Sequence, residues 1–145
     1  MFILGYSDYF DTPYTRWFAR FCNIVAIDPN VNLVRAMQAG AVGLKHARVL
    51  IVFPEGTRSI DGHVAEFKKG AAILAFELGV PIVPVGIRGG FEAWPRGGRF
   101  RRHPIEFHFG DPIDPREFGR TPDPYAAITD RLQKDVKVLA GDTPV

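Results

Sequence analysis

The apolar positions along the chain fall into short runs, separated by longer segments with helical spacing. Five runs rich in β-branched and aromatic residues predict β-strands at Phe2–Leu4, Ile24–Ile27, Val49–Phe53, Ile82–Val85 and Ile105–Phe109. The third run is apolar throughout, as in a strand that is covered on both faces. The fifth run alternates between apolar and polar residues and is therefore expected nearer a sheet edge.

Segments with helical periodicity lie between these runs. They predict helices from Pro13 to about Phe21, from Asn32 to Leu44, from Gly70 to Leu78 and from Asp123 to Leu139. Because strands and helices alternate, the expected fold class is α/β, with a mostly parallel sheet flanked by helices on both faces. The stretch from Gly89 to His103 has neither pattern and is predicted to be a long surface loop.

Length and composition narrow the class of protein. With 145 residues the chain is long enough for one domain with a hydrophobic core, so we expect a single domain over residues 1–145. The longest apolar stretch, 70–87, is interrupted by Glu77, Pro81 and Pro84 and does not predict a membrane-spanning helix. Cys22 is the sole cysteine, and the histidines show no metal-ligand spacing. We therefore expect no disulfide, no metal site and a reducing, cytoplasmic location.

The distribution of charge is more informative than its sum. A formal net charge of +2 is too small to indicate a nucleic-acid-binding protein, and no nucleic-acid partner is expected. Four arginines nevertheless lie within seven residues that contain no acid, close to Trp94 and Phe100: Arg96, Arg99, Arg101 and Arg102. Two interpretations stay open for this segment, namely contact with anionic lipid headgroups or an ordinary mobile basic loop.

The loop after the third predicted strand carries the residues best suited to bind phosphate. Ligands of open parallel sheets bind in loops at the carboxyl ends of strands. Gly56 lets backbone amides approach an anion, and Arg58 offers a planar fork of donors that fits two phosphate oxygens. Thr57 adds a hydroxyl, and Glu55 can accept a hydrogen bond from a substrate hydroxyl or hold Arg58 in place.

Two lysines follow this loop. Lys68 and Lys69 precede a predicted helix whose amino end also favours anions. The alternative is that Glu55 and Arg58 form a surface ion pair in a turn and that both lysines are solvated. The apolar strand before the loop and the Phe-Lys-Lys-Gly helix entry after it favour the phosphate site.

Three segments resemble motifs of the glycerophospholipid acyltransferase family, which includes lysophosphatidic acid acyltransferases. Phe53–Ser59, with the sequence FPEGTRS, resembles the third family motif. Phe67–Ala72 (FKKGAA) is similar to the element that follows it, and Val80–Val85 (VPIVPV) is similar to the fourth motif. The segments lie in the family's order, which makes the set far more specific than any one of them. The resemblance covers about Met1 to Gly110.

The resemblance implies a fold, a reaction and a set of site residues. It implies transfer of a fatty acyl group from acyl-CoA or acyl carrier protein to a lysophospholipid, with 1-acylglycerol 3-phosphate as the expected acceptor, in phospholipid biosynthesis. The acceptor phosphate would be bound by Glu55, Gly56, Thr57, Arg58 and Lys68. Pro84 would line the acyl site, although a packing role at a strand edge is an alternative of nearly the same weight for this residue.

The same resemblance carries expectations about cofactors and partners. No metal or organic cofactor is expected, because the acyl thioester is the co-substrate. Since the acceptor is a membrane lipid, we expect peripheral contact with the inner face of the cytoplasmic membrane. The oligomeric state stays open.

The general base of the family is the histidine of an H-x-x-x-x-D motif, in which the aspartate orients the imidazole. The residues five places after His46, His63, His103 and His108 are Ile51, Lys68, His108 and Ile113, so no histidine fits. His63, near the phosphate loop, is the one conceivable substitute, although a loop histidine is more often simply solvated.

The missing motif normally precedes the first strand, so we expect Met1 to fall inside the domain and the domain to lack its N-terminal portion. No catalytic residue is then expected in this chain, and we predict little or no acyl transfer activity. Two other functions stay open: a non-catalytic module that binds phosphate-bearing lipids, and a fragment of a larger fused acyltransferase. Binding of lysophosphatidate without turnover would favour the module.

Overall fold

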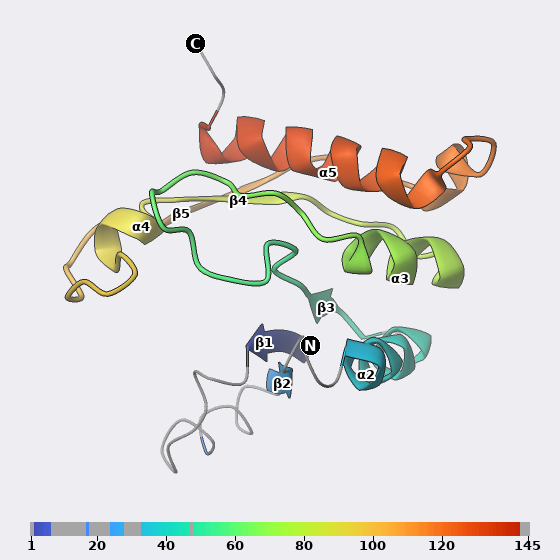
Figure 1. Ribbon diagram of the computed structural model, residues 1–145, viewed down its shortest axis with the longest axis horizontal. Coiled ribbons are helices and arrows are strands. Elements are labelled where there is room, and N and C mark those ends of the chain that lie inside the picture. Colours follow the sequence, from blue (N-terminus) through green and yellow to red (C-terminus); the bar gives the residue numbers. More distant parts are fainter. Residues whose placement is uncertain (1, 7–16, 18–23, 28–32, 47, 143–145) are drawn as a thin grey trace. The chain divides into compact units, whose positions relative to one another are not determined.

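The computed structural model describes residues 2–6, 17, 24–27, 33–46 and 48–142 (Figure 1). The chain divides into two compact units, Met1–Thr57 and Arg58–Val145, and each is described by itself. Trp17 is helical, but the rest of the helix predicted at 13–21 lies outside the described residues, as does Asn32. Within the described ranges, no helix is long and apolar enough to cross a bilayer. The expectation of a single domain over 1–145 stays a prediction.

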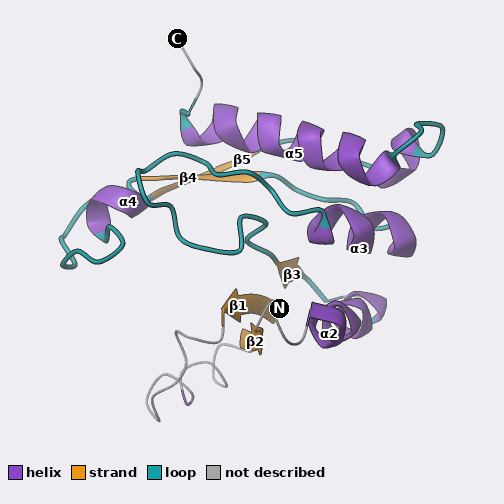
Figure 2. Ribbon diagram, in the orientation of Figure 1, coloured by secondary structure: helices purple, strands orange, loops and turns teal. Residues whose placement is uncertain are grey.

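The first unit contains a small parallel ladder. Its strands are β1 (Phe2–Tyr6), β2 (Ile24–Ile27) and β3 (Leu50–Ile51), in the order β2-β1-β3. Ile3 of β1 lies opposite Ile24 of β2 and Ile51 of β3, and both pairings are parallel. Parallel strands need a crossover connection, and α2 (Leu33–Lys45) lies in the connection between β2 and β3 (Figure 2).

The third strand is shorter and more exposed than its apolar sequence predicts. β3 comprises two residues and lies at the edge of the ladder, so it has a hydrogen-bonding partner on one side. Phe53 already belongs to the turn that ends the strand, because its carbonyl accepts a hydrogen bond from the Gly56 amide. Val49 and Phe53 are 65% and 53% exposed. The prediction of a strand that is covered on both faces is therefore wrong for these two residues.

The second unit contains helices of different length and an antiparallel ladder (Figure 2). Its elements are α3 (Gly70–Leu78), β4 (Val85–Arg88), α4 (Gly90–Ala93), β5 (Glu106–Phe109), the 3₁₀ helix η2 (Pro115–Phe118) and α5 (Pro124–Ala140). β4 and β5 pair antiparallel, with Val85 opposite Phe109. The chain returns through a four-residue helix and a loop instead of a long crossover helix, which explains this direction.

The elements of the second unit depart from the sequence-based prediction at two places. The strand predicted at Ile82–Val85 begins only at Val85, because Pro84 has no amide hydrogen to donate to a ladder. Ile82 instead forms an isolated antiparallel bridge with Ile113. The stretch predicted as a structureless loop, 89–103, contains α4.

The core of the second unit lies between α5 and the segments around it. One cluster of it contains the buried Phe67, Ile113 and Leu132, and the partly buried Val64, Ile82, Phe118 and Val136 pack against them. α5 begins where the Asp123 carboxylate accepts a hydrogen bond from the Ala126 amide at 2.9 Å.

The end of α5 crosses closely over β4. A Cβ atom added to Gly86 would lie 2.4 Å from the Ala140 amide nitrogen, so glycine is required at this crossing. Arg88, on the same face of the strand, donates from Nε to the Leu139 carbonyl at 2.9 Å. Together these contacts fix the carboxyl end of α5 against the ladder.

Candidate phosphate-binding site

The predicted phosphate loop leaves β3 through a tight turn. The Gly56 amide donates to the Phe53 carbonyl at 3.1 Å, so Pro54 and Glu55 occupy the central positions of the turn. The fixed φ of proline suits the first of these positions. Gly56 has a φ of 73°, which other residues rarely adopt, and this explains the glycine of the motif. Glu55 and Gly56 are half-buried and Thr57 is exposed.

Arg58 is held against an aromatic ring. Its guanidinium carbon lies 5.0 Å from the centroid of the Trp94 ring, a geometry in which the ring face attracts the cation. Trp94 in turn meets Phe100 edge to face, with ring centroids 6.4 Å apart. The sequence predicts Arg58 as a phosphate ligand but gives no signal for its aromatic partner, because the two residues are far apart in the chain.

The loop beyond Arg58 is closed by its own polar side chains. The Ser59 hydroxyl donates to the His63 carbonyl at 2.8 Å and accepts from the Gly62 amide at 2.9 Å. The Asp61 carboxylate accepts from the His63 amide at 3.0 Å, which lowers the pKa of Asp61. Local hydrogen bonds of this kind order a loop without a hydrophobic core.

His63 has an aspartate partner at the end of the chain's last helix. Its Nδ1 lies 2.6 Å from Oδ1 of Asp142, and the other carboxylate oxygen accepts from the Val64 amide at 2.7 Å. The hydrogen bond to Asp142 raises the pKa of His63 and lowers that of Asp142. A histidine that acts as a catalytic general base is likewise oriented by a carboxylate. The structure thus supplies His63 with an orienting acid that no sequence spacing indicated.

The two lysines after the loop have different surroundings. Phe67 is 6% exposed, and its amide donates to the Gln133 side chain at 3.1 Å, which anchors the segment to α5. Lys69 Nζ lies 2.9 Å from an Asp123 carboxylate oxygen and forms an ion pair with it. Lys68 is exposed. Lys68 is therefore better suited than Lys69 to meet a phosphate.

Pro84 is buried in the second unit. Less than 2% of the residue is exposed, and its carbonyl accepts from the Gly110 amide at 3.0 Å. A Cβ atom at Gly110 would lie 2.9 Å from the Pro84 ring, so the two residues are closely packed. The structure thus gives Pro84 a packing role, and its place in the acyl-site wall stays a prediction.

The residues of the predicted site are divided between the two units. Glu55, Gly56 and Thr57 end the first unit, and Arg58 and Lys68 belong to the second. The residues from 55 to 58 stay contiguous because they are consecutive in the chain. Binding of one phosphate by all five residues stays a prediction.

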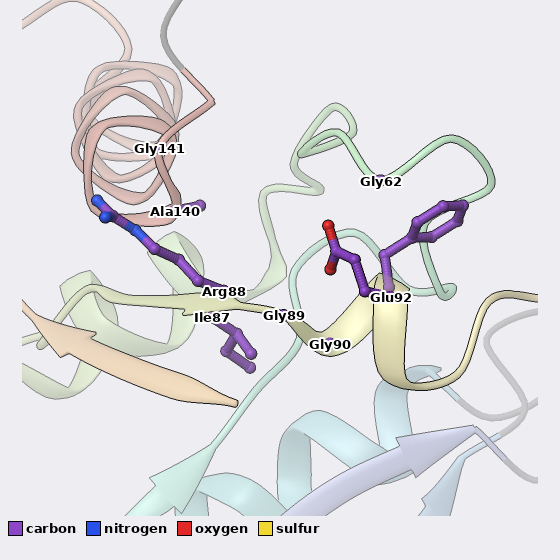
Figure 3. Close-up of a pocket in the computed structure, with 9 residues that line it drawn as sticks. Gly62, Ile87, Arg88, Gly89, Gly90, Glu92, Ala140 and Gly141 are labelled. Carbon is purple, nitrogen blue, oxygen red and sulfur yellow. The ribbon is translucent and has the colours of Figure 1, made fainter. Parts of the chain in front are cut away.

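A separate cavity of about 330 Å³ lies within the second unit (Figure 3). It is lined by Gly62, Phe91, Ala140, Gly141 and the segment from Ile87 to Gly90, together with Glu92. Arg88 extends along the end of α5, and Glu92 extends from α4 toward the loop that carries Gly62 (Figure 3). Arg88 already donates to a helix carbonyl, and the negative charge of Glu92 offsets its positive charge. This cavity therefore lacks the excess positive charge that a phosphate requires. The predicted phosphate-binding residues are not among those that line it.

Comparison with known proteins identifies relatives whose names share one activity. Over 98 residues the chain is 38% identical to the 1-acyl-sn-glycerol-3-phosphate acyltransferase of Limnanthes douglasii, covering 61% of this chain and 34% of that protein. Over 89 residues it is 32% identical to the protein of that name from Pseudomonas aeruginosa, covering 59% of this chain and 34% of the relative. The chain thus spans about a third of the length of these relatives.

A solved structure and a family profile agree with these relatives. The crystal structure of the 1-acyl-sn-glycerophosphate acyltransferase PlsC from Thermotoga maritima matches with a TM-score of 0.70 and 27% identity, over 99% of this chain and 58% of that one. This likeness supports the glycerolipid acyltransferase fold. The profile of the family described as Acyltransferase matches residues 1–88. The match takes in the FPEGTRS loop, the FKKGAA helix entry and the VPIVPV segment, and the chain belongs to the Acyltransferase family.

Proposed function

We propose that this chain is the acceptor-binding part of an acyltransferase in phospholipid biosynthesis. The full reaction transfers a fatty acyl group from acyl-CoA or acyl carrier protein to the free hydroxyl of a lysophospholipid, with 1-acylglycerol 3-phosphate as the acceptor. The observation that carries the proposal is the loop at 54–58, in which a glycine turn leads directly to an arginine held on an aromatic ring. The names of the relatives support the choice of acceptor.

Arg58 is the residue on which recognition of the acceptor depends most. A guanidinium presents two parallel N–H donors to two phosphate oxygens, and such charge-assisted pairs are roughly twice as strong as neutral hydrogen bonds. The Trp94 ring restricts the guanidinium before the ligand arrives, so less side-chain entropy is lost on binding. Lys68 adds a positive charge at an exposed position.

The chemical step places other demands on the protein. The acceptor hydroxyl must lose a proton as it attacks the thioester carbonyl, and the thiolate leaves. The thioester is itself an activated acyl group, so the proposed reaction requires no metal and no organic cofactor. Because the acceptor is a lipid, the proposed enzyme works peripherally at the inner face of the cytoplasmic membrane.

A second function, a non-catalytic module that binds phosphate-bearing lipids, is favoured by one observation. None of the four histidines has an aspartate five places later, so the chain itself lacks the H-x-x-x-x-D base. The phosphate loop needs no such base in order to bind a ligand. The two functions therefore predict the same acceptor binding and differ only in turnover.

The proposed acceptor site is tested by titrating the whole chain with a short-chain lysophosphatidate in a calorimeter. Arg58→Ala should weaken binding about 10- to 100-fold, because a buried or half-buried hydrogen bond to a charged group is lost. Arg58→Lys should restore only part of the affinity, because an ammonium has no planar fork. The matched control is Arg120→Ala, which removes an exposed arginine from the same unit. Equal affinity of the Arg58→Ala and Arg120→Ala variants would contradict the site.

A further inference from the structure

The segment from 94 to 103, here named the basic loop, is an ordered excursion from the second unit. The Arg101 amide donates to the Ala93 carbonyl at 2.7 Å and so ties the far side of the loop back to α4. Within it, the Gly98 amide donates to the Pro95 carbonyl at 3.0 Å and closes a turn. The loop follows α4 and projects at the opposite end of the second unit from α3 (Figure 1).

The surface of the basic loop combines positive charge with exposed aromatic rings. Its four arginines are all exposed, at Arg96, Arg99, Arg101 and Arg102, and no acid lies between residues 94 and 103. Trp94 is 55% exposed and Phe100 is 72% exposed. The two rings contact each other edge to face, so they form one apolar point among the cations. Contiguous exposed apolar side chains that are rimmed by polar residues often mark sites of interaction.

The basic loop also contacts Arg58, which belongs to the same unit. The Trp94 ring, at the start of the basic loop, is the ring that carries the Arg58 guanidinium at 5.0 Å. The Trp94 ring thus contacts Arg58, the residue proposed to bind the acceptor phosphate. A flat surface that contacts the basic loop at Trp94 therefore also lies close to Arg58.

We propose that the basic loop is a docking surface for an anionic lipid bilayer. Its arginines contact lipid phosphates, while the rings of Trp94 and Phe100 enter the headgroup layer. Docking then holds Arg58 at the level of the membrane where a lipid phosphate lies. The docking itself does not depend on the proposed acyltransferase function, and only its consequence for Arg58 does.

The chemistry of the loop favours a bilayer over a nucleic acid. A tryptophan in contact with a second ring, with cations around it, fits the interface of a membrane, where aromatic side chains lie at headgroup level. Stacking with successive bases would instead require rings that stand apart and present free faces. One face of Trp94 is already occupied by Arg58, and the Trp94 ring also contacts the Phe100 ring.

The test is sedimentation of the whole chain with vesicles of phosphatidylcholine, with and without phosphatidylglycerol. We expect binding to the anionic vesicles that weakens with added salt. Each basic side chain near such a surface contributes roughly a fivefold gain in affinity, so the triple variant Arg99→Gln/Arg101→Gln/Arg102→Gln should bind about a hundredfold more weakly.

The control variant removes the same charge elsewhere on the second unit. Arg116→Gln/Arg120→Gln/Lys134→Gln changes three exposed positions outside the basic loop and should bind nearly as well as the wild-type chain. Equal losses in the two triple variants would overturn the proposal, as would equal binding to vesicles with and without phosphatidylglycerol. Tighter binding to a single-stranded oligonucleotide than to the anionic vesicles would also overturn it, in favour of a nucleic-acid surface.

Entry of the rings into the headgroup layer has its own readout. With Trp17→Phe in place, Trp94 is the sole tryptophan, and lipids brominated near the headgroup should quench its fluorescence in vesicles that contain phosphatidylglycerol. Fluorescence that stays unquenched while the chain is vesicle-bound would exclude the docking geometry proposed here. Because neither assay contains an acyl donor or a lysophospholipid, failure of docking is distinguishable from failure of the proposed acceptor binding.

Discussion

Individual residues of this chain take their roles from partners that lie far away in the sequence. Arg58 is the arginine of a recognisable motif, and its orientation depends on Trp94. His63 has no motif at all, and its orientation depends on Asp142. Local sequence indicated which side chains carry charge near the phosphate loop. It carried no information on which ring or carboxylate would meet them.

The His63–Asp142 pair predicts a pH-dependent contribution to stability. Because the pKa of His63 is raised by Asp142, the contribution is present in full below about pH 6.5 and is lost as the pH rises through the raised value. Because the pKa of Asp142 is lowered, the contribution is also lost as the pH falls through that lowered value. His63→Gln should therefore lower the melting temperature near pH 5.5 and have little effect near pH 9.

Thermal unfolding monitored by circular dichroism at several pH values checks this expectation. Asp142→Asn is the matched variant, because it removes the other half of the pair. The double variant should lose no more of the pH-dependent stability than either single variant loses. If the melting temperatures of the wild type and His63→Gln differed by the same amount at pH 5.5 and pH 9, the pair would make no pH-dependent contribution to stability.

At the scale of helices and strands, sequence signals predicted the existence of elements better than their pairing. Gly79, with a φ of 61°, ends α3 where the predicted helix stop lies, and Asp123 begins α5. These ends depend on hydrogen bonds between near neighbours, which is why the sequence predicts them. The antiparallel direction of β5 and the short helix α4 depend on how a return connection packs, and the sequence did not predict them.

The crossing of α5 over β4 leads to a stability prediction. Gly86→Ala places a methyl group where the helix backbone runs, at 2.4 Å from the Ala140 nitrogen, and should destabilise the chain by about 1–3 kcal/mol. Gly70→Ala is the control, because a Cβ atom there would meet nothing within 4 Å and alanine favours a helix. Urea denaturation compares the two variants. If the Gly86→Ala variant proved as stable as the Gly70→Ala variant, α5 would not lie this close to β4.

At the scale of the whole molecule, the Acyltransferase profile and the PlsC likeness agree with the motifs read from the sequence. The chain nevertheless spans about a third of the length of the relatives it matches. The residues predicted to bind the acceptor phosphate fall on both sides of this division, because Thr57 ends the first unit and Arg58 begins the second. Acceptor binding and acyl transfer by this chain can be measured separately.

We predict little or no acyl transfer by the purified 145-residue chain. The absence of the family's H-x-x-x-x-D base lowers the rate by about 10²–10⁴-fold. Thiol release from acyl-CoA in the presence of lysophosphatidate, followed with a thiol reagent, measures this rate. Binding without thiol release would favour the lipid-binding module.

Robust thiol release would contradict the prediction and direct attention to His63. In that case His63→Asn should abolish turnover while leaving lysophosphatidate binding intact. If His63→Asn kept the rate, the base would have to lie elsewhere in the chain. Reading the in-frame codons upstream of Met1 for an H-x-x-x-x-D motif separates a longer enzyme from a module.

The sequence by itself determined the family and the helices at 70–78 and 124–140, and it predicted phosphate binding by the loop at 54–58. These depend on residue type, spacing and local hydrogen bonds, all of which can be read along the chain. Only the tertiary structure decided that Trp94 carries Arg58, that Asp142 orients His63 and that α5 requires Gly86. Each is a contact between segments distant in sequence, and packing, which local periodicity does not specify, brings them together.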